Sequence, residues 1–341
     1  MFAPLIERLV RREDLSEAEA GDAMEAIMEG GATPAQIAGL LVALRMKGER
    51  AAEVVGLART MRRHSVRVPH GFKDVFDTCG TGGDGSGSLN ISSIAALVVA
   101  ACGVRVAKHG NRSVSSRCGS ADLFESLGVE IEAGPEVVAR CMAEAGIGFC
   151  FAPAFHPAMR HAAQARRDLG VRSAFNLLGP LTNPAGATRQ LVGVPRADMT
   201  ELVARALAEL GSVRAWVVHG SDGLDELSTT GHTKVSECRD GFVRTFYLHP
   251  RDAGLPVATL ADLEGGEAGA NAEIARAVLA GEPGPARDVV LLNAGAALLV
   301  AERASSLVEG VELAGRAIDG GAAAATLASM VTVSRAAAVE A

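Results

Sequence analysis

The sequence predicts an α/β protein in which a small N-terminal α-helical domain precedes a large α/β domain with a mostly parallel central sheet covered by helices. Two observations predict this class. The first 65 or so residues carry helix-period patterns without a strand pattern, whereas short apolar runs alternate with helical segments from Asp74 onward. The 341 residues, 48% of them hydrophobic, suffice to bury a core in both parts. We therefore expect the helical domain to span residues 1–70 and the α/β domain residues 71–341.

The helices expected near the N-terminus have well-formed starts. Ser16 and Glu19 have the spacing of a capping box, in which two side chains satisfy free backbone N–H groups at the start of a helix. Thr33 and Gln36 repeat this spacing around a proline at the first helical position. The inward face of a third helix is expected to carry Val54, Leu57, Ala58 and Met61. The turn-forming segment 69–71 then ends the domain.

The α/β part alternates expected strands with expected helices. The strands, read as short apolar runs bounded by turn residues, are 75–78, 104–107, 129–131, 147–151, 191–194, 215–219 and 242–249. The helices begin near Asn90, Ser120, Pro135, Pro157 and Asp198, and alanine-rich helices follow from Ala270 to the end. Because parallel strands need crossover connections, this alternation favours a sheet covered on both faces.

Composition narrows the classes of partner. The formal charge of −7 gives the chain no basic field of the kind that extended nucleic-acid or anionic-membrane binding requires. The six cysteines are scattered without metal-ligand spacing, and the longest apolar run is much shorter than a bilayer span. We therefore expect a cytoplasmic protein whose partners are small molecules, with no nucleic acid and no membrane.

The glycine-rich run from Gly80 to Gly85 lies between an expected strand and an expected helix. Glycine adopts positive φ and lets the backbone approach a ligand closely, so such a run forms a row of N–H donors suited to phosphate. The helix after it opens with residues 90–93, whose hydroxyls and free N–H groups add a partial positive charge. This context indicates a phosphate-binding loop.

The same run also satisfies the dinucleotide spacing GxGxxG, with Gly80, Gly82 and Gly85. A nicotinamide dehydrogenase would place an acidic residue about 20 positions further on to bind the ribose hydroxyls. The chain instead offers Lys108, His109 and Arg112, which suit further phosphate or the 2′-phosphate of NADP. The glycine run alone therefore leaves phosphate and dinucleotide ligands open.

Two further motifs carry chemistry. The segment KHGNRSVSS, residues 108–116, combines three basic residues with hydroxyls at a strand end, where open sheets bind ligands, and could hold a second anionic group. Asp225 and Glu226, in the motif DGLDE, are adjacent carboxylates on a loop after a strand, which suits Mg²⁺. Adjacent acids on turns are common, so this second motif is informative only beside the phosphate loops.

Together these motifs resemble the anthranilate phosphoribosyltransferase family. The shared segments are GTGGD at residues 80–84, NIS at 90–92, KHGNRSVSS at 108–116, GSAD at 119–122, FNLLGPLTNPA at 175–185, DGLDE at 222–226 and LRMKGE at 44–49. The similarity covers essentially the whole chain, and the order of the motifs makes it specific. Ser88 and Cys118 depart from the commoner threonine and serine of the family.

The resemblance implies a pentosyltransferase that moves the phosphoribosyl group of 5-phosphoribosyl 1-diphosphate to the amine of anthranilate, in tryptophan biosynthesis. It also implies two Mg²⁺ ions, with Ser92 as ligand of one and Asp225 and Glu226 as ligands of the other. Residues of the two glycine- and serine-rich segments would bind 5-phosphoribosyl 1-diphosphate: Gly80, Gly83, Asp84, Ser88, Asn90, Ile91, Ser92, Ser93, Lys108, His109, Gly110, Asn111, Arg112, Ser113, Val114, Ser115, Ser116 and Ser120.

The anthranilate site follows from the same resemblance. Arg166 would bind the carboxylate, and His156, Met159 and Gly179 would line the slot for the ring, with Asn111 facing it. Lys108 and Arg166 are thus the expected catalytic residues, and the segment near 166–187 is expected to join the two domains. The family also implies a homodimer that pairs through the helical domain.

Two alternative functions remain open on the residues. A pyrimidine-nucleoside phosphorylase would share the architecture and a related glycine loop, although KHGNRSVSS and FNLLGPLTNPA favour the transferase. A non-catalytic nucleic-acid-binding relative would need a basic surface, against which the charge of −7 argues.

Overall fold

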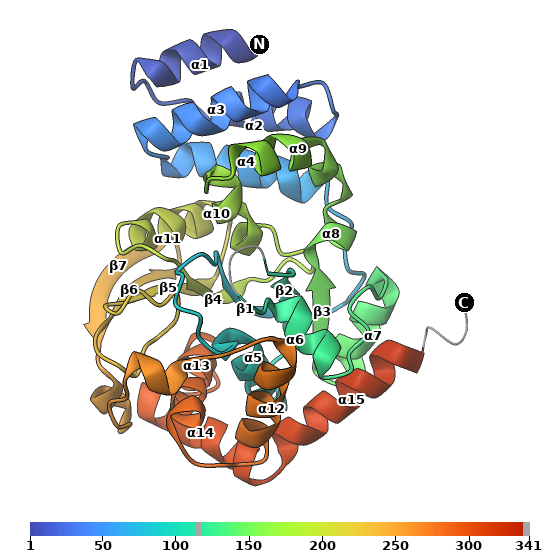
Figure 1. Cartoon of the computed structure of the whole chain (residues 1–341), viewed down its shortest axis with the longest axis vertical. Coiled ribbons are helices and arrows are strands. Elements are labelled where there is room, and N and C mark those ends of the chain that lie inside the picture. The colour runs from blue at the N-terminus through green and yellow to red at the C-terminus, as the bar shows by residue number, and fades with distance from the viewer. Residues whose placement is uncertain (114–116, 337–341) are drawn as a thin grey trace.

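The computed structural model describes residues 1–113 and 117–336, which form a helical layer stacked on an α/β layer (Figure 1). The helical layer lies at one end of the long axis, the sheet occupies the middle, and the C-terminal helices close the other end (Figure 1). This arrangement confirms the predicted fold class.

The helical layer contains α1 (Phe2–Val10), α2 (Glu17–Met28), α3 (Pro34–Lys47) and α4 (Ala51–Arg63). Both predicted capping boxes are present, with Ser16 paired to Glu19 and Thr33 paired to Gln36. Helix α9 (Arg160–Leu169), distant in sequence, packs on α2 and α3 and so belongs to this layer. The sequence analysis did not single out α1, whose apolar positions Phe2, Leu5 and Leu9 are buried.

The strands of the described residues form one sheet in the order β3-β2-β1-β4-β5-β6-β7. Strands β1 to β5 are parallel, and β6 and β7 extend the sheet in antiparallel fashion. Their bounds are β1 (Phe76–Gly80), β2 (Val106–Gly110), β3 (Ile147–Phe151), β4 (Arg189–Gly193), β5 (Arg214–Gly220), β6 (Thr233–Arg239) and β7 (Phe242–Leu248). The mostly parallel sheet was thus correctly predicted.

Two strand predictions were wrong. Residues 129–131 form no strand: Val129 and Ile131 are buried in the core, and the backbone of Glu130 donates to the Ser334 hydroxyl instead of a ladder partner. Strand β6 was missed because its alternation of Lys234, Ser236 and other polar residues hides its pairing with two neighbours.

The sheet is covered by helices on both faces (Figure 1). They are α5 (Ile91–Ala101), α6 (Ser120–Ser126), α7 (Pro135–Glu144), α8 (Ala152–Phe155), α10 (Ala174–Leu181), α11 (Met199–Glu209), α12 (Ala268–Leu279), α13 (Pro285–Val300), α14 (Leu307–Asp319) and α15 (Ala322–Ala336), with short 3₁₀ turns η1 (Pro157–Met159), η2 (Pro250–Ala253) and η3 (Leu260–Leu263). None of the described helices is both long and apolar enough to cross a membrane alone; only α14 and α15 taken together, across a 65° bend, have the length and composition.

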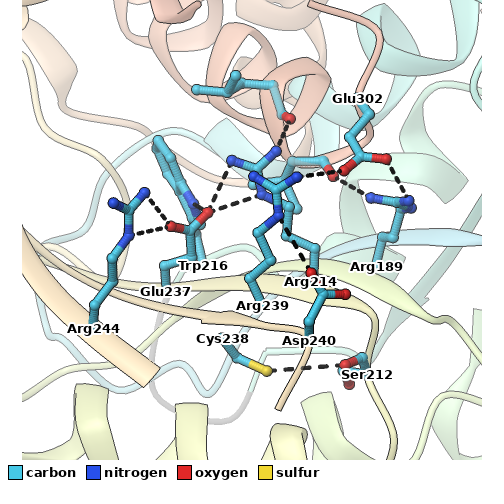
Figure 2. A network of polar contacts seen from close by, with 12 residues as sticks. Arg189, Ser212, Arg214, Trp216, Glu237, Cys238, Arg239, Asp240, Arg244 and Glu302 are labelled. Carbon is cyan, nitrogen blue, oxygen red and sulfur yellow. Dashed lines mark hydrogen bonds and ion pairs between the residues drawn. The ribbon is translucent and has the colours of Figure 1, made fainter. Parts of the chain in front are cut away.

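A polar cluster fixes the antiparallel edge of the sheet to helix α13 (Figure 2). Glu237 of β6 is 1% exposed and accepts hydrogen bonds from Arg214, Trp216 and Arg244. Burial alone would raise the pKa of Glu237, but these three donors hold it below its ordinary value. Arg214 also donates to the Leu299 carbonyl, so an arginine satisfies the free end of α13.

Candidate active site

The predicted site residues gather where the strand order of the sheet reverses. Strand β1 lies between β2 and β4, and ligands of open α/β sheets bind at the carboxyl ends of strands around such a point. Gly80 ends β1 and Gly193 ends β4, and a Cβ at either position would overlap with Asp225. Both strands therefore end in glycine so that the DGLDE loop can lie across them.

The glycine loop, residues 81–90, connects β1 to α5. Gly82, Gly83, Gly85 and Gly87 all have positive φ, between 64° and 78°, a conformation that side chains oppose. The Gly82 amide donates to the Asp225 carboxylate at 2.9 Å. One backbone N–H of the loop is thus directed at the DGLDE carboxylate, and the predicted role of the loop in phosphate binding stays a prediction.

Asp225 and Glu226 are held close to the loop and are poorly compensated. Glu226 is 9% exposed and accepts from the backbone N–H of Ser92 at 3.1 Å. Burial raises the pKa of both carboxyl groups, and the charge of Asp84 raises that of Asp225 while the charge of Asp225 raises that of Glu226. Negative charge is therefore concentrated here beyond what the nearby protein cations balance.

This environment fits Mg²⁺. Within the described residues, no three His, Cys, Asp or Glu side chains gather closely enough to hold a metal ion by themselves. Mg²⁺ usually takes one or two carboxylates and completes its octahedron with water and substrate phosphate. The chemistry of Asp225 and Glu226 therefore fits one Mg²⁺ whose remaining ligands are water and substrate phosphate, and the predicted assignment of Ser92 to a second ion stays a prediction.

Lys108 brings a buried cation to these carboxylates. The side chain is 2% exposed, and its ammonium group donates to the Thr78 carbonyl in the middle of β1. Its positive charge lowers the pKa values of Glu226 and of the fully buried Asp77, although burial dominates and raises both. The ammonium group thus acts on two carboxylates near the start of the glycine loop.

Asp77 is a buried residue of this site that the sequence analysis missed. Its carboxylate accepts from the His109 backbone at 3.1 Å and from the Asn183 side chain at 2.8 Å. Asn183 also donates to the Ala107 carbonyl. The TNPA part of FNLLGPLTNPA is thereby fixed against β1 and β2. A charged residue inside the apolar run VFDTCG was the signal that could have revealed it.

A second group of predicted residues contains two buried imidazoles that lie next to each other. The rings of His109 and His156 lie 5.1 Å apart, and Nδ1 of His109 lies 3.0 Å from the Gly179 carbonyl oxygen. Burial lowers the pKa of His109 to about 3 and that of His156 to about 4, so both are neutral at pH 7. The fold thus brings together His109 of β2, which was assigned to the phosphate-binding segment, and His156 and Gly179, which were assigned to the anthranilate slot.

The cation expected for anthranilate lies on the helical layer. Arg166 is exposed near the end of α9, and its guanidinium lies 5.8 Å from the ring centre of Phe175. Phe175 belongs to α10, the helix that also carries Gly179. Met159, at the end of η1, is partly buried. These contacts place Arg166 and the imidazole pocket on neighbouring elements.

The KHGNRSVSS segment is only partly described. Arg112 is paired with Asp122 and Glu125 of α6, at 3.0 and 2.7 Å, so its guanidinium faces protein carboxylates. Asn111 is exposed, and its carbonyl accepts from the Ser120 hydroxyl at 3.4 Å. The predicted ligands Val114, Ser115 and Ser116 lie outside the described residues.

Cys118 is buried beside this segment. Burial raises the pKa of its thiol to about 11. The thiol therefore stays protonated at neutral pH, which opposes a role as a nucleophile.

Two other residues were missed because only long-range contacts reveal them. Asn293, fully buried on α13, accepts from the Leu227 amide and donates to the Leu227 carbonyl, so it fixes the end of the DGLDE loop. Arg172 follows α9 and donates to the Thr81 carbonyl of the glycine loop at 2.9 Å. A polar residue inside the apolar run VLLNAG hints at Asn293, whereas the sequence gives no comparable signal for Arg172.

Comparison with known families covers nearly the whole chain. Residues 3–65 match the helical bundle domain of a glycosyl transferase family, and residues 72–324 match the α/β domain of the same family. An anthranilate phosphoribosyltransferase of Moorella thermoacetica is 58% identical over 97% of this chain and 98% of its own length. That of Symbiobacterium thermophilum is 54% identical over 96% of each chain.

Solved structures give the same result. Anthranilate phosphoribosyltransferase from Thermus thermophilus superposes with a TM-score of 0.92, at 47% identity, over 97% of this chain and 99% of its own. The enzyme from Saccharomyces cerevisiae, in complex with PRPP and Mg, gives a TM-score of 0.90 at 27% identity over 98% of both chains. A further yeast structure contains 4-fluoroanthranilate.

Proposed function

We propose the following function for this chain, which belongs to the anthranilate phosphoribosyltransferase family. It transfers the phosphoribosyl group of 5-phosphoribosyl 1-diphosphate to the amine of anthranilate. The products are N-(5-phosphoribosyl)anthranilate and diphosphate, and the reaction serves tryptophan biosynthesis. The observation that carries the proposal is that the Asp225–Glu226 pair contacts the glycine loop and the start of α5 and lies within reach of the Lys108 charge.

The leaving diphosphate sets the electrostatic demand of the reaction. Breaking the bond at C1 of the ribose places negative charge on the diphosphate and positive charge on the sugar. The buried ammonium group of Lys108 and the loop amides supply fixed positive charge for the leaving group. Bound Mg²⁺ would neutralise further charge on the diphosphate, held by Asp225, Glu226 and Ser92.

The amine needs orientation more than deprotonation, because an aryl amine is a neutral nucleophile at pH 7. A carbonyl oxygen can only accept, so Nδ1 of His109 carries the proton that is donated to Gly179, and Nε2 keeps its lone pair. With its pKa lowered to about 3, this imidazole accepts a hydrogen bond without taking up a proton. His109 is therefore suited to orient an N–H group rather than to act as a strong base.

The proposed substrate-binding residues fall into two sets, one for each substrate. For 5-phosphoribosyl 1-diphosphate we propose the glycine loop, the described part of KHGNRSVSS and Ser120. For anthranilate we propose Arg166 as the carboxylate partner, with His156, Met159 and Gly179 around the ring. The yeast complexes with PRPP and Mg and with 4-fluoroanthranilate support this pairing of ligands.

We also propose two Mg²⁺ ions per active site, a cytoplasmic location and a homodimer. The helical layer, with residues 1–70 as its main part, would supply the dimer contact, since Val10, Val42 and Met46 expose apolar surface there. Residues 71–341 would form the phosphoribosyl-diphosphate-binding domain. Light scattering of the purified protein decides the oligomeric state.

The function is tested by following anthranilate fluorescence with 5-phosphoribosyl 1-diphosphate, in the presence and absence of Mg²⁺. We expect the signal to fall only when all three components are present. An unchanged signal in the complete mixture would contradict the proposal. Phosphorolysis of thymidine or uridine by the same sample would instead favour a nucleoside phosphorylase.

A further inference from the structure

Arg172 links the helical layer to the glycine loop. Helix α9 ends at Gly170, which adopts the left-handed conformation with φ 59° and turns the chain out of the helix. Two residues later, the carbonyl of Arg172 accepts a hydrogen bond from the guanidinium of Arg45 on α3. The backbone at Arg172 is thus anchored to the helical layer.

The side chain of Arg172 reaches the opposite way, into the glycine loop. Its NH2 group donates to the Thr81 carbonyl at 2.9 Å. Its guanidinium lies so close to Gly83 that a Cβ there would overlap with it. The φ of 78° favours glycine at position 83, and a side chain there would displace the Arg172 guanidinium from the loop.

The charges around Arg172 match this position. Arg172 is partly buried, and burial lowers its pKa, while the nearby carboxylates of Asp225 and Asp84 act in the opposite direction. Asp84 is in the loop, and Asp225 accepts from the Gly82 amide on the same loop. A single guanidinium thus donates to a loop carbonyl and lies within electrostatic reach of one carboxylate in the loop, Asp84, and of one that contacts the loop, Asp225.

We propose that Arg172 is a positioning residue that holds the glycine loop ready for the diphosphate and fastens it to the helical layer. The role in diphosphate binding rests on the proposed function. The holding of the loop does not, because it is argued from contacts within the chain alone. The guanidinium suits this task, since it donates to the Thr81 carbonyl and lies next to Gly83.

The first test measures amide hydrogen exchange of residues 81–89 in the substrate-free protein. Loss of a hydrogen bond of about 1.4 kcal/mol makes exchange about tenfold faster, and we expect this change in R172Q. The matched control is R167Q, because Arg167 lies on the helix that precedes Arg172 and donates to the exposed Gln164. Equal amide exchange in R172Q and R167Q overturns the proposal. This is the outcome expected if Arg172 acts only as a direct diphosphate ligand.

The second test separates the two substrates. If the glycine loop adopts its binding-competent conformation for a smaller fraction of the time, the apparent affinity falls by that fraction. The KM for 5-phosphoribosyl 1-diphosphate should therefore rise about tenfold in R172Q. The KM for anthranilate should change less than about twofold, and R172K, which keeps the charge, should recover part of the loss. Equal rises in both KM values would indicate general damage and overturn the proposal.

A third variant guards against misfolding of R172Q. R45Q keeps the Arg172 side chain but removes the bond that anchors its carbonyl, so exchange of residues 81–89 should also become faster. Unchanged exchange in R45Q overturns the link to the helical layer. If wild-type protein consumes no anthranilate, the proposed function fails, while the exchange experiment still decides the role of Arg172.

Discussion

At the residue scale, the chemistry depends on a few charges held in fixed positions. Lys108 is buried, so its ammonium group keeps a fixed position when charge develops on a leaving group. Its bond to the Thr78 carbonyl sets its direction, and Glu226 and Asp77 lie close enough to feel its charge. A preorganised cation of this kind contributes to the transition state without reorganisation during the reaction.

Lys108→Ala should therefore lower kcat by about 100- to 1,000-fold, the usual cost of removing one preorganised group from a charge-stabilising site. Anthranilate fluorescence measures the rate, and thermal unfolding shows whether the fold is intact. Lys73→Ala is the control, because Lys73 is exposed before β1. Near-wild-type kinetics of the Lys108 variant would remove this residue from the mechanism.

Arg166→Gln tests the assignment of the second substrate. A charge-assisted hydrogen bond contributes about 1.5–3 kcal/mol, so the KM for anthranilate should rise about 10- to 100-fold. The KM for 5-phosphoribosyl 1-diphosphate should remain within about twofold, since that substrate binds elsewhere. R167Q again serves as control. If only the KM for the diphosphate substrate changes, Arg166 does not bind anthranilate.

The sequence predicted those candidate site residues that lie within local motifs. The glycine loop, Lys108 and the Asp225–Glu226 pair were predicted because strand ends and glycine spacing are visible along the chain. Asp77 and Arg172 were not predicted, since their partners Asn183 and Thr81 are 106 and 91 positions away. Only the folded sheet brings such partners together.

At the element scale, helix α13 positions the DGLDE loop through Asn293. Asn293 exchanges two hydrogen bonds with the backbone of Leu227, directly after Glu226, and a third with the Val289 carbonyl. The side chain is fully buried, so it replaces water as the partner of these backbone groups. The geometry of Asp225 and Glu226 thus depends on a helix residue that lies 66 positions beyond Leu227 in the sequence.

Asn293→Leu should lower the free energy of unfolding by about 2–4 kcal/mol, because backbone groups of Leu227 stay buried without a partner. It should also raise the Mg²⁺ concentration needed for half-maximal activity. Urea denaturation and Mg²⁺ titration measure the two effects. Val290→Ala on the same helix should cost comparable stability through a cavity and leave the Mg²⁺ requirement unchanged. An identical Mg²⁺ dependence in both variants would contradict the role of Asn293.

Elements with a clear period were predicted well, and those without one were not. The capping boxes at Ser16 and Thr33 fixed two helix starts to the residue. The apolar residues at 129–131 looked like a strand, although the segment pairs with no neighbouring strand and its apolar side chains fill the core. Strand β6 carries buried Ser236 and Glu237, whose partners on other strands and on α11 make their burial possible.

At the scale of the whole molecule, the helical layer and the sheet share one core. The cluster that contains the inward residues of α1 to α4 also includes Leu178 of α10 and Val192 and Val217 of the sheet. Arg62 of α4 donates to the carbonyls of Leu181 and Leu210, which fastens the two layers from another side. The helical layer therefore packs directly against the α/β layer on either side of residue 70. The sequence could not show these contacts because they link distant segments.

The acid stability of the whole molecule depends in part on the buried imidazole of His156. Among the described residues, neither ring nitrogen of His156 has a hydrogen-bond partner, and burial lowers its pKa to about 4. The unfolded chain, with a pKa near 6.5, binds the proton first, so lowering the pH from about 6.5 to 4 reduces the free energy of unfolding by up to about 1.4 kcal/mol per pH unit.

His156→Phe removes this titration and two unpaired polar atoms. It should unfold at the same or higher temperature at pH 7.5 and lose less stability than wild type at pH 5, as thermal melts at both pH values would show. Parallel losses in the two proteins would mean that His156 is already protonated, or exposed, in the folded state.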